Sequence, residues 1–188
     1  MTNKNEEMLE VVNEEGEVMG LEERKVIHEK GLLHREVHIM FVTLQKEIIF
    51  QHREKDKASW PDSLDATAGG HVDPSESVLV TAVREVKEET NLEINSSDLV
   101  FVGVVRSSIF EPKTGVNNNV IRTCYGYLFT GNLCDLKIEQ GKIIGFVKYK
   151  YEDLKNLSEI EKKKFIPERL EKEYMEMYAK IFEGFKII

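Results

Sequence analysis

The chain has 188 residues, of which 41% are hydrophobic and 32% are charged, which is typical of one globular domain with a buried core. Its formal net charge of -8 argues against non-specific binding to nucleic acid or to an anionic membrane. The charge does not exclude a phosphate-bearing substrate, because bound divalent cations can invert the local field.

Cysteine content and hydropathy predict where such a protein works. Cys124 and Cys134 are too few for a disulfide framework, and no four-ligand zinc pattern exists. The first residues lack a basic segment followed by an apolar run, so no signal peptide is expected. No apolar run reaches the roughly eighteen residues of a membrane span. We therefore expect a cytoplasmic protein with reduced thiols and one domain over residues 1–188.

The first third of the chain predicts short strands, one helix and one loop. In chain order, we expect a strand at 8–13, a return strand at 18–19, a helix at 21–30, strands at 36–44 and 48–54, a loop at 55–65 with the single tryptophan, Trp60, and a short strand at 65–68. Residues 1–35 would then form an N-terminal extension with a hairpin and a short helix.

The second half predicts more strands and a C-terminal helix. In chain order, we expect a strand at 99–110, a loop at 111–119, strands at 120–130, 133–138 and 143–149, a short helix at 151–157, and a helix at 167–183 that begins with Pro167. Hairpins separated by helices predict a mixed α/β sheet covered by helices.

Between these halves lies the stretch GHVDPSESVLVTAVREVKEETNL, residues 70–92, which carries the chemistry. At 3.6 residues per turn, Glu85, Glu88 and Glu89 share one helix face. Like charges at this spacing repel by about 0.2–0.5 kcal/mol per pair, so the face favours a cation or an arginine among the carboxylates. The pattern therefore indicates a helix whose carboxylates bind a metal cation or pair with an arginine.

This spacing resembles the Nudix box: Gly, five residues, Glu, seven residues, Arg-Glu, an aliphatic, any residue, Glu-Glu, any residue, Gly, an aliphatic. The matching residues are Gly70, Glu76, Arg84, Glu85, Val86, Glu88, Glu89 and Leu92. The one departure is Asn91 in place of the last glycine. Asparagine tolerates the left-handed conformation that such a helix cap requires.

The resemblance implies the Nudix fold, an α/β/α sandwich around a mixed β-sheet, and hydrolysis of a diphosphate joined to another group. Glu85 and Glu89 are the expected ligands of Mg²⁺ (with Mn²⁺ as a substitute), and the carbonyl of Gly70 could add a ligand. Glu88 is a third ligand or the base that orients water. Arg84 is expected to orient one of the glutamates, and Glu76 to tie the loop to the helix.

The general base has a second candidate. Many family members use a glutamate in a later loop, and Glu139 is nearest to that position. An exposed turn residue is the other interpretation of Glu139.

A wider resemblance points to the isopentenyl-diphosphate isomerase-like branch of the family. It rests on His28, Gly31-Leu32, His34-Arg35, Gln51-His52-Arg53, Lys57, Trp60-Pro61 and Gly69-Gly70-His71. The isomerase cysteine falls at Gly69 here, and the later strand lacks the isomerase glutamate, so the acid–base pair is incomplete. For the same reason, His28, His34 and His71 are expected to have surface or hydrogen-bonding roles rather than to match the isomerase metal site.

We therefore predict a Mg²⁺-dependent hydrolase of a nucleoside diphosphate derivative or another small organic diphosphate. The alternatives are isomerase-like activity and a non-catalytic diphosphate-binding module. We expect no nucleic-acid or membrane partner, and a homodimer through the N-terminal hairpin is compatible with the pattern.

Overall fold

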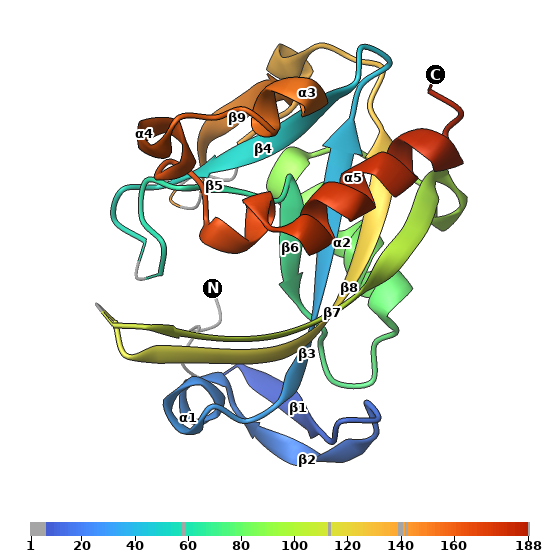
Figure 1. Cartoon of the computed structure of the whole chain (residues 1–188). Coiled ribbons are helices and arrows are strands. Elements are labelled where there is room, and N and C mark those ends of the chain that lie inside the picture. The colour runs from blue at the N-terminus through green and yellow to red at the C-terminus, as the bar shows by residue number, and fades with distance from the viewer. Residues whose placement is uncertain (1–6, 58, 113, 139–140, 142, 188) are drawn as a thin grey trace.

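The computed structural model describes residues 7–57, 59–112, 114–138, 141 and 143–187. Within this part of the chain, one seven-stranded sheet lies between helices, and a separate two-stranded sheet packs beside α1 (Figure 1). The strands are β1 (Met8–Val12), β2 (Val18–Glu23), β3 (His34–Val42), β4 (Glu47–Arg53), β5 (Leu64–Asp65), β6 (Ala68–His71), β7 (Leu99–Glu111), β8 (Val116–Leu128) and β9 (Ile143–Lys150). The helices are α1 (Arg24–Lys30), α2 (Val78–Thr90), α3 (Tyr151–Leu154), α4 (Glu159–Lys162) and α5 (Lys172–Gly184).

Strand β3 is the centre of the large sheet. It pairs in parallel with β8 and antiparallel with β4 and β6, in a sheet ordered β5-β4-β3-β8-β7. Strand β9 joins the sheet through β4. The sheet is therefore mixed, as predicted.

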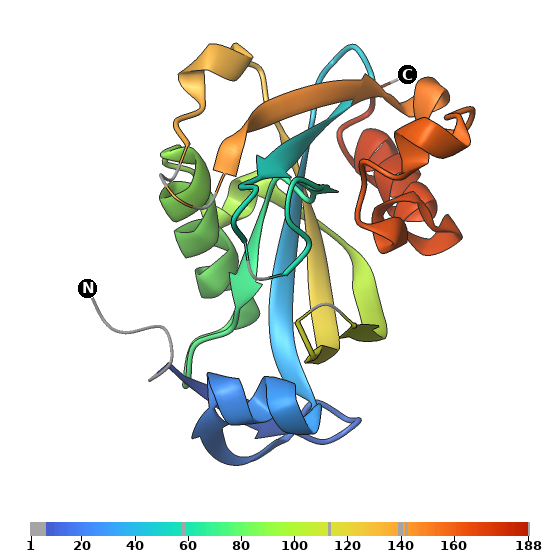
Figure 2. The same ribbon diagram turned by 90° about the vertical axis from the view of Figure 1, so that its left-hand side faces the viewer.

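The two faces of β3 build two cores. Val37, Ile39 and Phe41 pack toward α2, whereas Met40 and Val42 pack toward α5. This alternation follows from the two-residue period of a strand. Figure 2 shows α2 and α5 on opposite sides of the sheet. The arrangement confirms the predicted α/β/α sandwich.

Helix α2 is held by its caps and its apolar stripe. The Ser77 side chain accepts a hydrogen bond from the backbone N–H of Val80 at the start of the helix. At its end, Asn91 adopts the left-handed conformation, with φ of 59°, as expected for the residue that replaces glycine. Ala82 and Val86 are fully buried, and burial of a valine side chain contributes about 1.5–3 kcal/mol.

The predicted loop at 111–119 is wrong. Strands β7 and β8 continue through most of it and form a long hairpin that projects from the sheet (Figure 1), with Phe110 opposite Asn117. Asparagine residues usually favour turns. Here they remain in a strand because Asn118 donates a hydrogen bond to Glu36 and Asn119 donates one to the carbonyl of Gly31.

Other boundaries also differ from the sequence prediction. The expected strand at 133–138 contains instead a short 3-10 turn at Leu133–Asp135, because the Asp135 side chain accepts a hydrogen bond from the backbone of Asn132. The expected helix at 167–183 begins as a 3-10 turn at Pro167–Leu170 before α5 starts at Lys172. Residues 21–23 belong to β2, since Leu21 pairs with Glu10 of β1. In the part of the chain described, no helix is long and apolar enough to cross a membrane.

Candidate active site

The glycine that opens the predicted motif lies directly against its first helix carboxylate. Gly70 pairs with Val37 in the β3–β6 ladder, and a side-chain Cβ at Gly70 would overlap the carboxylate of Glu85. No side chain larger than hydrogen fits here without displacing that carboxylate. The structure thus brings the first glycine of the motif against its first helix carboxylate.

Arg84 lies among several carboxylates. Its guanidinium is 2.8 Å from Glu85 Oε1, 3.2 Å from Glu76 Oε2 and 3.2 Å from Asp73 Oδ2. The Glu88 carboxylate is slightly farther, at 3.5 Å. Burial opposes its charge, but the neighbouring carboxylates outweigh burial and raise the pKa of Arg84. Arg84 is therefore placed to orient carboxylates.

Glu76 joins the loop before the helix to the helix itself. Its Oε2 accepts hydrogen bonds from the Thr81 hydroxyl, at 2.7 Å, and from Arg84. Burial acts in the opposite direction, but these two donors lower the pKa of the Glu76 carboxyl.

Glu89 is held from the sheet side of the helix. Its Oε2 accepts hydrogen bonds from the backbone N–H of Gly69, at 3.1 Å, and from the Gln51 amide, at 3.3 Å. Glu85 and Glu89 are both 7% exposed, whereas the side chain of Glu88 is 46% exposed. The three carboxylates thus differ in access to water.

These carboxylates line a cavity of about 1140 Å³. Its other walls come from α1, the 55–65 loop, the β7–β8 hairpin and the 3-10 turn before α5. Basic side chains line the same cavity, among them Arg53 and Lys57. A space of this size, with acidic and basic groups, suits a small anionic ligand.

The residues present fit a hard divalent cation. Four carboxylates, from Asp73, Glu76, Glu85 and Glu88, lie within 4 Å of the single guanidinium of Arg84. The donors are all oxygen atoms, which Mg²⁺ and Mn²⁺ prefer. Glu139, the other base candidate, lies outside the described residues.

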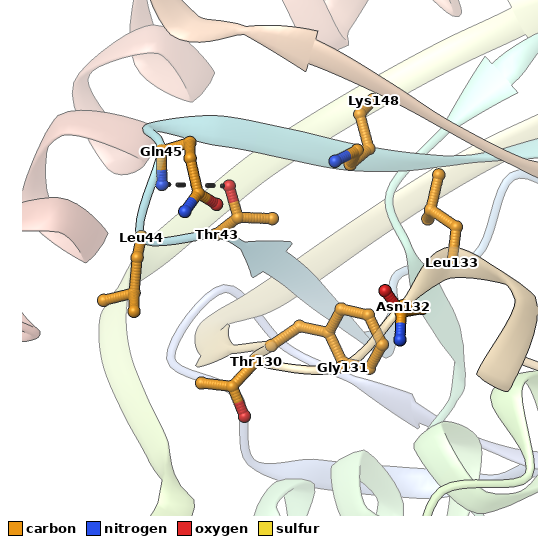
Figure 3. Close-up of a pocket in the computed structure, with 9 residues that line it drawn as sticks. Thr43, Leu44, Gln45, Thr130, Gly131, Asn132, Leu133 and Lys148 are labelled. Atoms are coloured by element: carbon orange, nitrogen blue, oxygen red, sulfur yellow. Dashed lines mark hydrogen bonds between the residues drawn. The ribbon is translucent and has the colours of Figure 1, made fainter.

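A second, smaller pocket of about 200 Å³ contains none of the predicted site residues. It lies near the turn between β3 and β4, where Figure 3 shows Thr43, Gln45, Asn132 and Lys148 around it. It carries no carboxylate cluster, so we do not assign the chemistry to it.

The position of the isomerase cysteine offers little room. A Cβ at Gly69 would lie 2.6 Å from the His38 ring and 2.7 Å from the carbonyl of Val37. A side chain at this position would therefore meet the His38 ring and the Val37 backbone.

Sequence reasoning missed a buried ionic network on the α5 face of the sheet. Arg122 of β8 pairs with Glu36 at 2.9 Å and with Glu168 at 3.1 Å. Arg169 pairs with Asp65 at 2.7 Å. A charged residue in the middle of the apolar strand VIRTCYGYLF was the one available signal. This network borders the same cavity.

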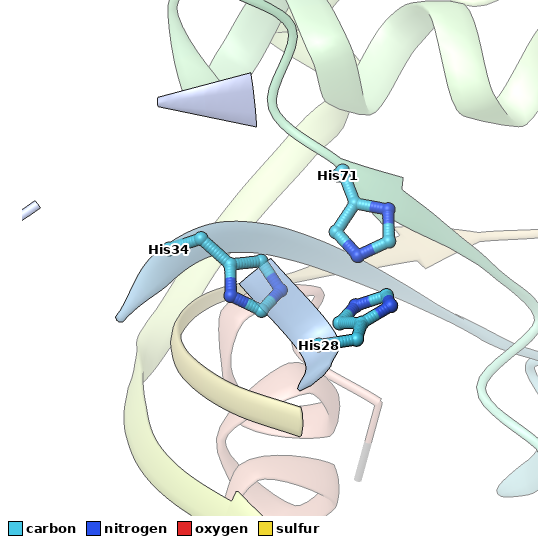
Figure 4. Close-up of side chains that lie close together, drawn as sticks. All are labelled: His28, His34 and His71. Carbon is cyan, nitrogen blue, oxygen red and sulfur yellow. The ribbon is translucent and has the colours of Figure 1, made fainter. Parts of the chain in front are cut away.

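The surface role expected for the histidines is wrong for His34, whereas the hydrogen-bonding role holds for it, because its Nδ1 lies 2.9 Å from the carbonyl oxygen of Leu32. His34 is fully buried, and the Nε2 atoms of His28, His34 and His71 are buried without hydrogen-bond partners. The three rings gather into one cluster (Figure 4).

Comparison with known proteins now identifies the class. The NUDIX domain family matches residues 32–168, which is most of the chain. The chain belongs to this family. Its relatives carry hydrolase names, which supports an enzyme that acts on diphosphate bonds.

Individual relatives are similar over different shares of their length. The uncharacterized Nudix hydrolase CA_C0446 of Clostridium acetobutylicum is 28% identical over 79% of this chain and 72% of that protein. Nudix hydrolase 3 of Arabidopsis thaliana is 28% identical over 92% of this chain but only 23% of its own length. The uncharacterized Nudix hydrolase YfcD of Escherichia coli is 37% identical over 46% of this chain and 48% of that protein. The chain therefore spans less than half the length of the Arabidopsis thaliana and Escherichia coli relatives.

Solved structures agree on the fold. DR0079 from Deinococcus radiodurans superposes with a TM-score of 0.60 at 24% identity, over 80% of this chain and 88% of that one. The MutT protein from Methanosarcina mazei Go1 also gives 0.60, at 16% identity, over 82% and 96% of the two chains. These likenesses support the Nudix fold alone.

Proposed function

We propose that the chain is a Mg²⁺-dependent hydrolase, with Mn²⁺ as a substitute, that cleaves a nucleoside diphosphate derivative or another small organic diphosphate. The observation that supports this most strongly is the contact between Gly70 and the Glu85 carboxylate at the wall of the large cavity. It brings the first glycine of the motif to the helix carboxylates, with Glu88 and Glu89 on the same helix face as Glu85.

The proposed ligand set consists of Glu85 and Glu89, with Glu88 as a third carboxylate and the Gly70 carbonyl as a further oxygen. The bound ion would lower the pKa of a water molecule and neutralise phosphate charge. Arg84 would act as a positioning residue, because its contact with Glu85 fixes the orientation of that carboxylate.

Glu88 is our candidate for the group that takes the proton from the attacking water. Its side chain is the most exposed of the three helix carboxylates, at 46%, so solvent reaches it. A positioned carboxylate can serve as a general base. Glu139 stays the alternative base in this proposal.

The substrate class follows from charge and size. Arg53 and Lys57 line the cavity that also holds the carboxylates, and cationic side chains favour phosphate groups. The cavity volume of about 1140 Å³ exceeds the usual range of about 300–1,000 Å³ for small-ligand sites. A diphosphate with a sizeable second group would therefore fit.

The proposal also covers assembly and location. A single domain over residues 1–188, a cytoplasmic location and the absence of nucleic-acid and membrane partners remain parts of it. Val18, Met19 and Leu21 leave apolar side chains exposed on β2. Such a surface is compatible with a homodimer through the N-terminal hairpin.

The test is product release from a panel of diphosphates, with and without Mg²⁺. The panel holds nucleotide sugars, ADP-ribose, dinucleotides, coenzyme A, thiamine diphosphate, nucleoside triphosphates and isopentenyl diphosphate. Metal-dependent hydrolysis of one compound, lost in Glu85→Gln, is the expected result. Isomerisation of isopentenyl diphosphate would favour the isomerase alternative. Absence of Mg²⁺ binding would contradict the catalytic proposal and favour a diphosphate-binding module.

A further inference from the structure

Trp60, the single tryptophan of the chain, lies in the loop between β4 and β5 and lines the large cavity. Its backbone φ of 48° is in the left-handed region, which bulky residues rarely adopt. Residues held in such a conformation concentrate at active sites and ligand clamps, where the surrounding contacts maintain them. The backbone conformation of Trp60 therefore points to a binding role for its side chain.

Hydrogen bonds on both sides of the residue hold the Trp60 backbone in place. Its N–H donates to Glu111 Oε1 of β7, at 3.1 Å, and its carbonyl accepts from Arg53 Nε of β4, at 3.2 Å. Arg53 also donates to the carbonyl of Ser59, at 2.9 Å. Figures 1 and 2 show this loop on the same side of the molecule as the projecting end of the β7–β8 hairpin. Contacts with two strands thus fix the position from which the indole ring extends.

The Trp60 side chain does not contribute to either hydrophobic core. It is partly buried, and it belongs to neither of the two apolar clusters that α2 and α5 form with the sheet. Among the described residues, only the backbone of Trp60 makes hydrogen bonds. A loop tryptophan that merely covered the core would pack against one of these clusters. The indole ring is therefore available to a ligand in the cavity.

Branched aliphatic side chains continue the cavity wall beside Trp60. Three of them line the same cavity: Ile109, Val116 and Ile166. Ile109 shares a strand face with Glu111, which contacts the Trp60 backbone and is opposite Val116 in the β7–β8 ladder. Ile166 donates its backbone N–H to the carbonyl of Leu64, where the loop ends. One part of the cavity wall is therefore apolar, although charged groups line most of the rest.

An unsatisfied acceptor lies next to this apolar wall. Asn118 is opposite Ile109 in the β7–β8 ladder and lines the same cavity. Its Nδ2 donates to Glu36 Oε1, at 3.1 Å, and because an ionised carboxylate only accepts, the other amide atom of Asn118 is the oxygen. That Oδ1 is buried without a hydrogen-bond partner among the described residues. A ligand with an N–H group would supply the donor that this oxygen lacks.

We propose that the indole face of Trp60 stacks on the base of a nucleoside diphosphate derivative, so that Trp60 selects the second group of the substrate; this inference rests on the proposed hydrolase function. A nucleobase has apolar faces and a polar edge with N–H groups, which suits a wall that combines the Trp60 ring with Asn118 Oδ1. A purely aliphatic group would instead desolvate the charged side chains of the cavity without replacing their partners. Tryptophan offers a large, rigid face, so stacking on it costs little conformational entropy.

The first test uses the fluorescence of the chain, which comes from Trp60 as the single tryptophan. The full chain in Mg²⁺ is titrated with the α,β-methylene analogues of ADP and CDP, whose bridging carbon resists hydrolysis. Methylene diphosphonate, which has no base, is the ligand control, and free N-acetyltryptophanamide corrects for absorption by the nucleotides. We expect at least one nucleotide analogue to quench the indole emission and methylene diphosphonate to leave it unchanged.

Trp60→Leu removes the stacking face and keeps an apolar side chain. Calorimetric titration should show a loss of affinity for the quenching nucleotide of about 5- to 100-fold, with unchanged affinity for methylene diphosphonate. Trp60→Phe retains an aromatic face and should stay within about threefold of the unchanged chain. Phe110→Leu is the matched control, because Phe110 lies on the same hairpin, is 61% exposed and does not line the cavity. It should bind both ligands as the unchanged chain does.

Three results would overturn the proposal: no quenching by either nucleotide analogue, equal nucleotide affinity in Trp60→Leu, or an equal loss of affinity for methylene diphosphonate, which would show a structural role. Circular dichroism checks the folding of each variant. If Trp60→Leu does not fold, the unchanged chain decides, because bound nucleotide should protect Trp60 from quenching by acrylamide. Quenching without any hydrolysis in the diphosphate panel would contradict the proposed hydrolase but not the stacking. Hydrolysis of only those diphosphates that lack a base would contradict the stacking but not the hydrolase.

Discussion

The carboxylate site and the histidine cluster line one cavity but are built in opposite ways. Glu85, Glu88 and Glu89 come from one helix, and Glu85 and Glu88 both pair with Arg84 of that helix. The histidines come from three elements, and their Nε2 atoms have no hydrogen-bond partner within the described structure. The first site can be recognised from spacing alone, whereas the second exists only after the sheet forms.

The two regions also differ in how much their charged groups should contribute to folding and to activity. Beside the histidines, Arg122 and its carboxylate partners are almost fully buried, and their charges need one another. Among the helix carboxylates, in contrast, the side chain of Glu88 is half-exposed. We therefore expect changes near the histidines to affect folding most, and changes on the α2 face to affect activity most.

The largest expected effect is the loss of stability in Arg122→Met. The substitution leaves Glu36 buried without its arginine and leaves Glu168 with Arg169 alone, and breaking a buried pair typically costs about 3–5 kcal/mol. Urea denaturation measures this. Arg106→Met is the control, because the exposed pair of Arg106 with Glu14 contributes about 0–1 kcal/mol. Equal losses of stability in the two variants would contradict the expected difference between the buried and the exposed ion pairs.

Glu85→Gln should lower metal-dependent hydrolysis by about 10²–10³, the usual cost of removing one preorganised electrostatic group. The side chain keeps its size, so stability should change little. Steady-state kinetics on the substrate found by the panel measures this. Glu93→Gln is the matched control, since Glu93 is 85% exposed and pairs with Lys87. Activity within twofold of the unchanged chain in Glu85→Gln would show that the ligand assignment is wrong.

Gly70→Ala tests the contact that joins the motif. The added methyl group would overlap the Glu85 carboxylate, and displacing it should reduce Mg²⁺ affinity by about 10–100-fold. Stability should fall by about 1–3 kcal/mol, as for other overpacked sites. Gly20→Ala is the control, because a Cβ there meets no atom within 4 Å. Unchanged Mg²⁺ affinity in Gly70→Ala would show that the Gly70 contact does not contribute to metal binding.

His38→Gln tests how the buried side chain of His38 makes the stability of the chain depend on pH. Burial, together with Arg169 and Arg122, holds the pKa of His38 well below its ordinary value of about 6.5. The unfolded chain then binds a proton that the folded chain does not, so His38 lowers stability by about 1.4 kcal/mol per pH unit as pH falls below about 6.5.

Denaturation at a series of pH values measures this slope. Above pH 8 the difference between His38→Gln and the unchanged chain should be constant, because His38 is then neutral in both states. Parallel curves down to pH 5 would contradict the prediction.

The smallest expected effect concerns the cap of α2. Asn91 has φ of 59°, a conformation that costs most residues about 1–2 kcal/mol but that asparagine and glycine tolerate. Asn91→Ala should destabilise the chain by about 1 kcal/mol, because alanine adopts this conformation poorly, and Asn91→Gly should destabilise it less. Thermal denaturation measures both. Equal stability of the two variants would show that the cap conformation carries no cost.

Local features of this protein could be predicted from its sequence because neighbours along the chain create them. The 3.6-residue period places Glu85, Glu88 and Glu89 on one face of α2, and the cap at Asn91 follows from the same helix. Together with the spacing from Gly70, these residues predicted the candidate carboxylate site, and their resemblance to the Nudix box implied the fold class.

Tertiary structure decided what depends on strand pairing. The pairing of β3 with β6 sets Glu36 opposite His71, and the pairing of β3 with β8 sets Arg122 opposite Glu36. A shift by one residue would turn these side chains to the other face. Because no local pattern records that register, the sequence alone determined the helix carboxylates, whereas only the folded sheet brought His28, His34 and His71 together.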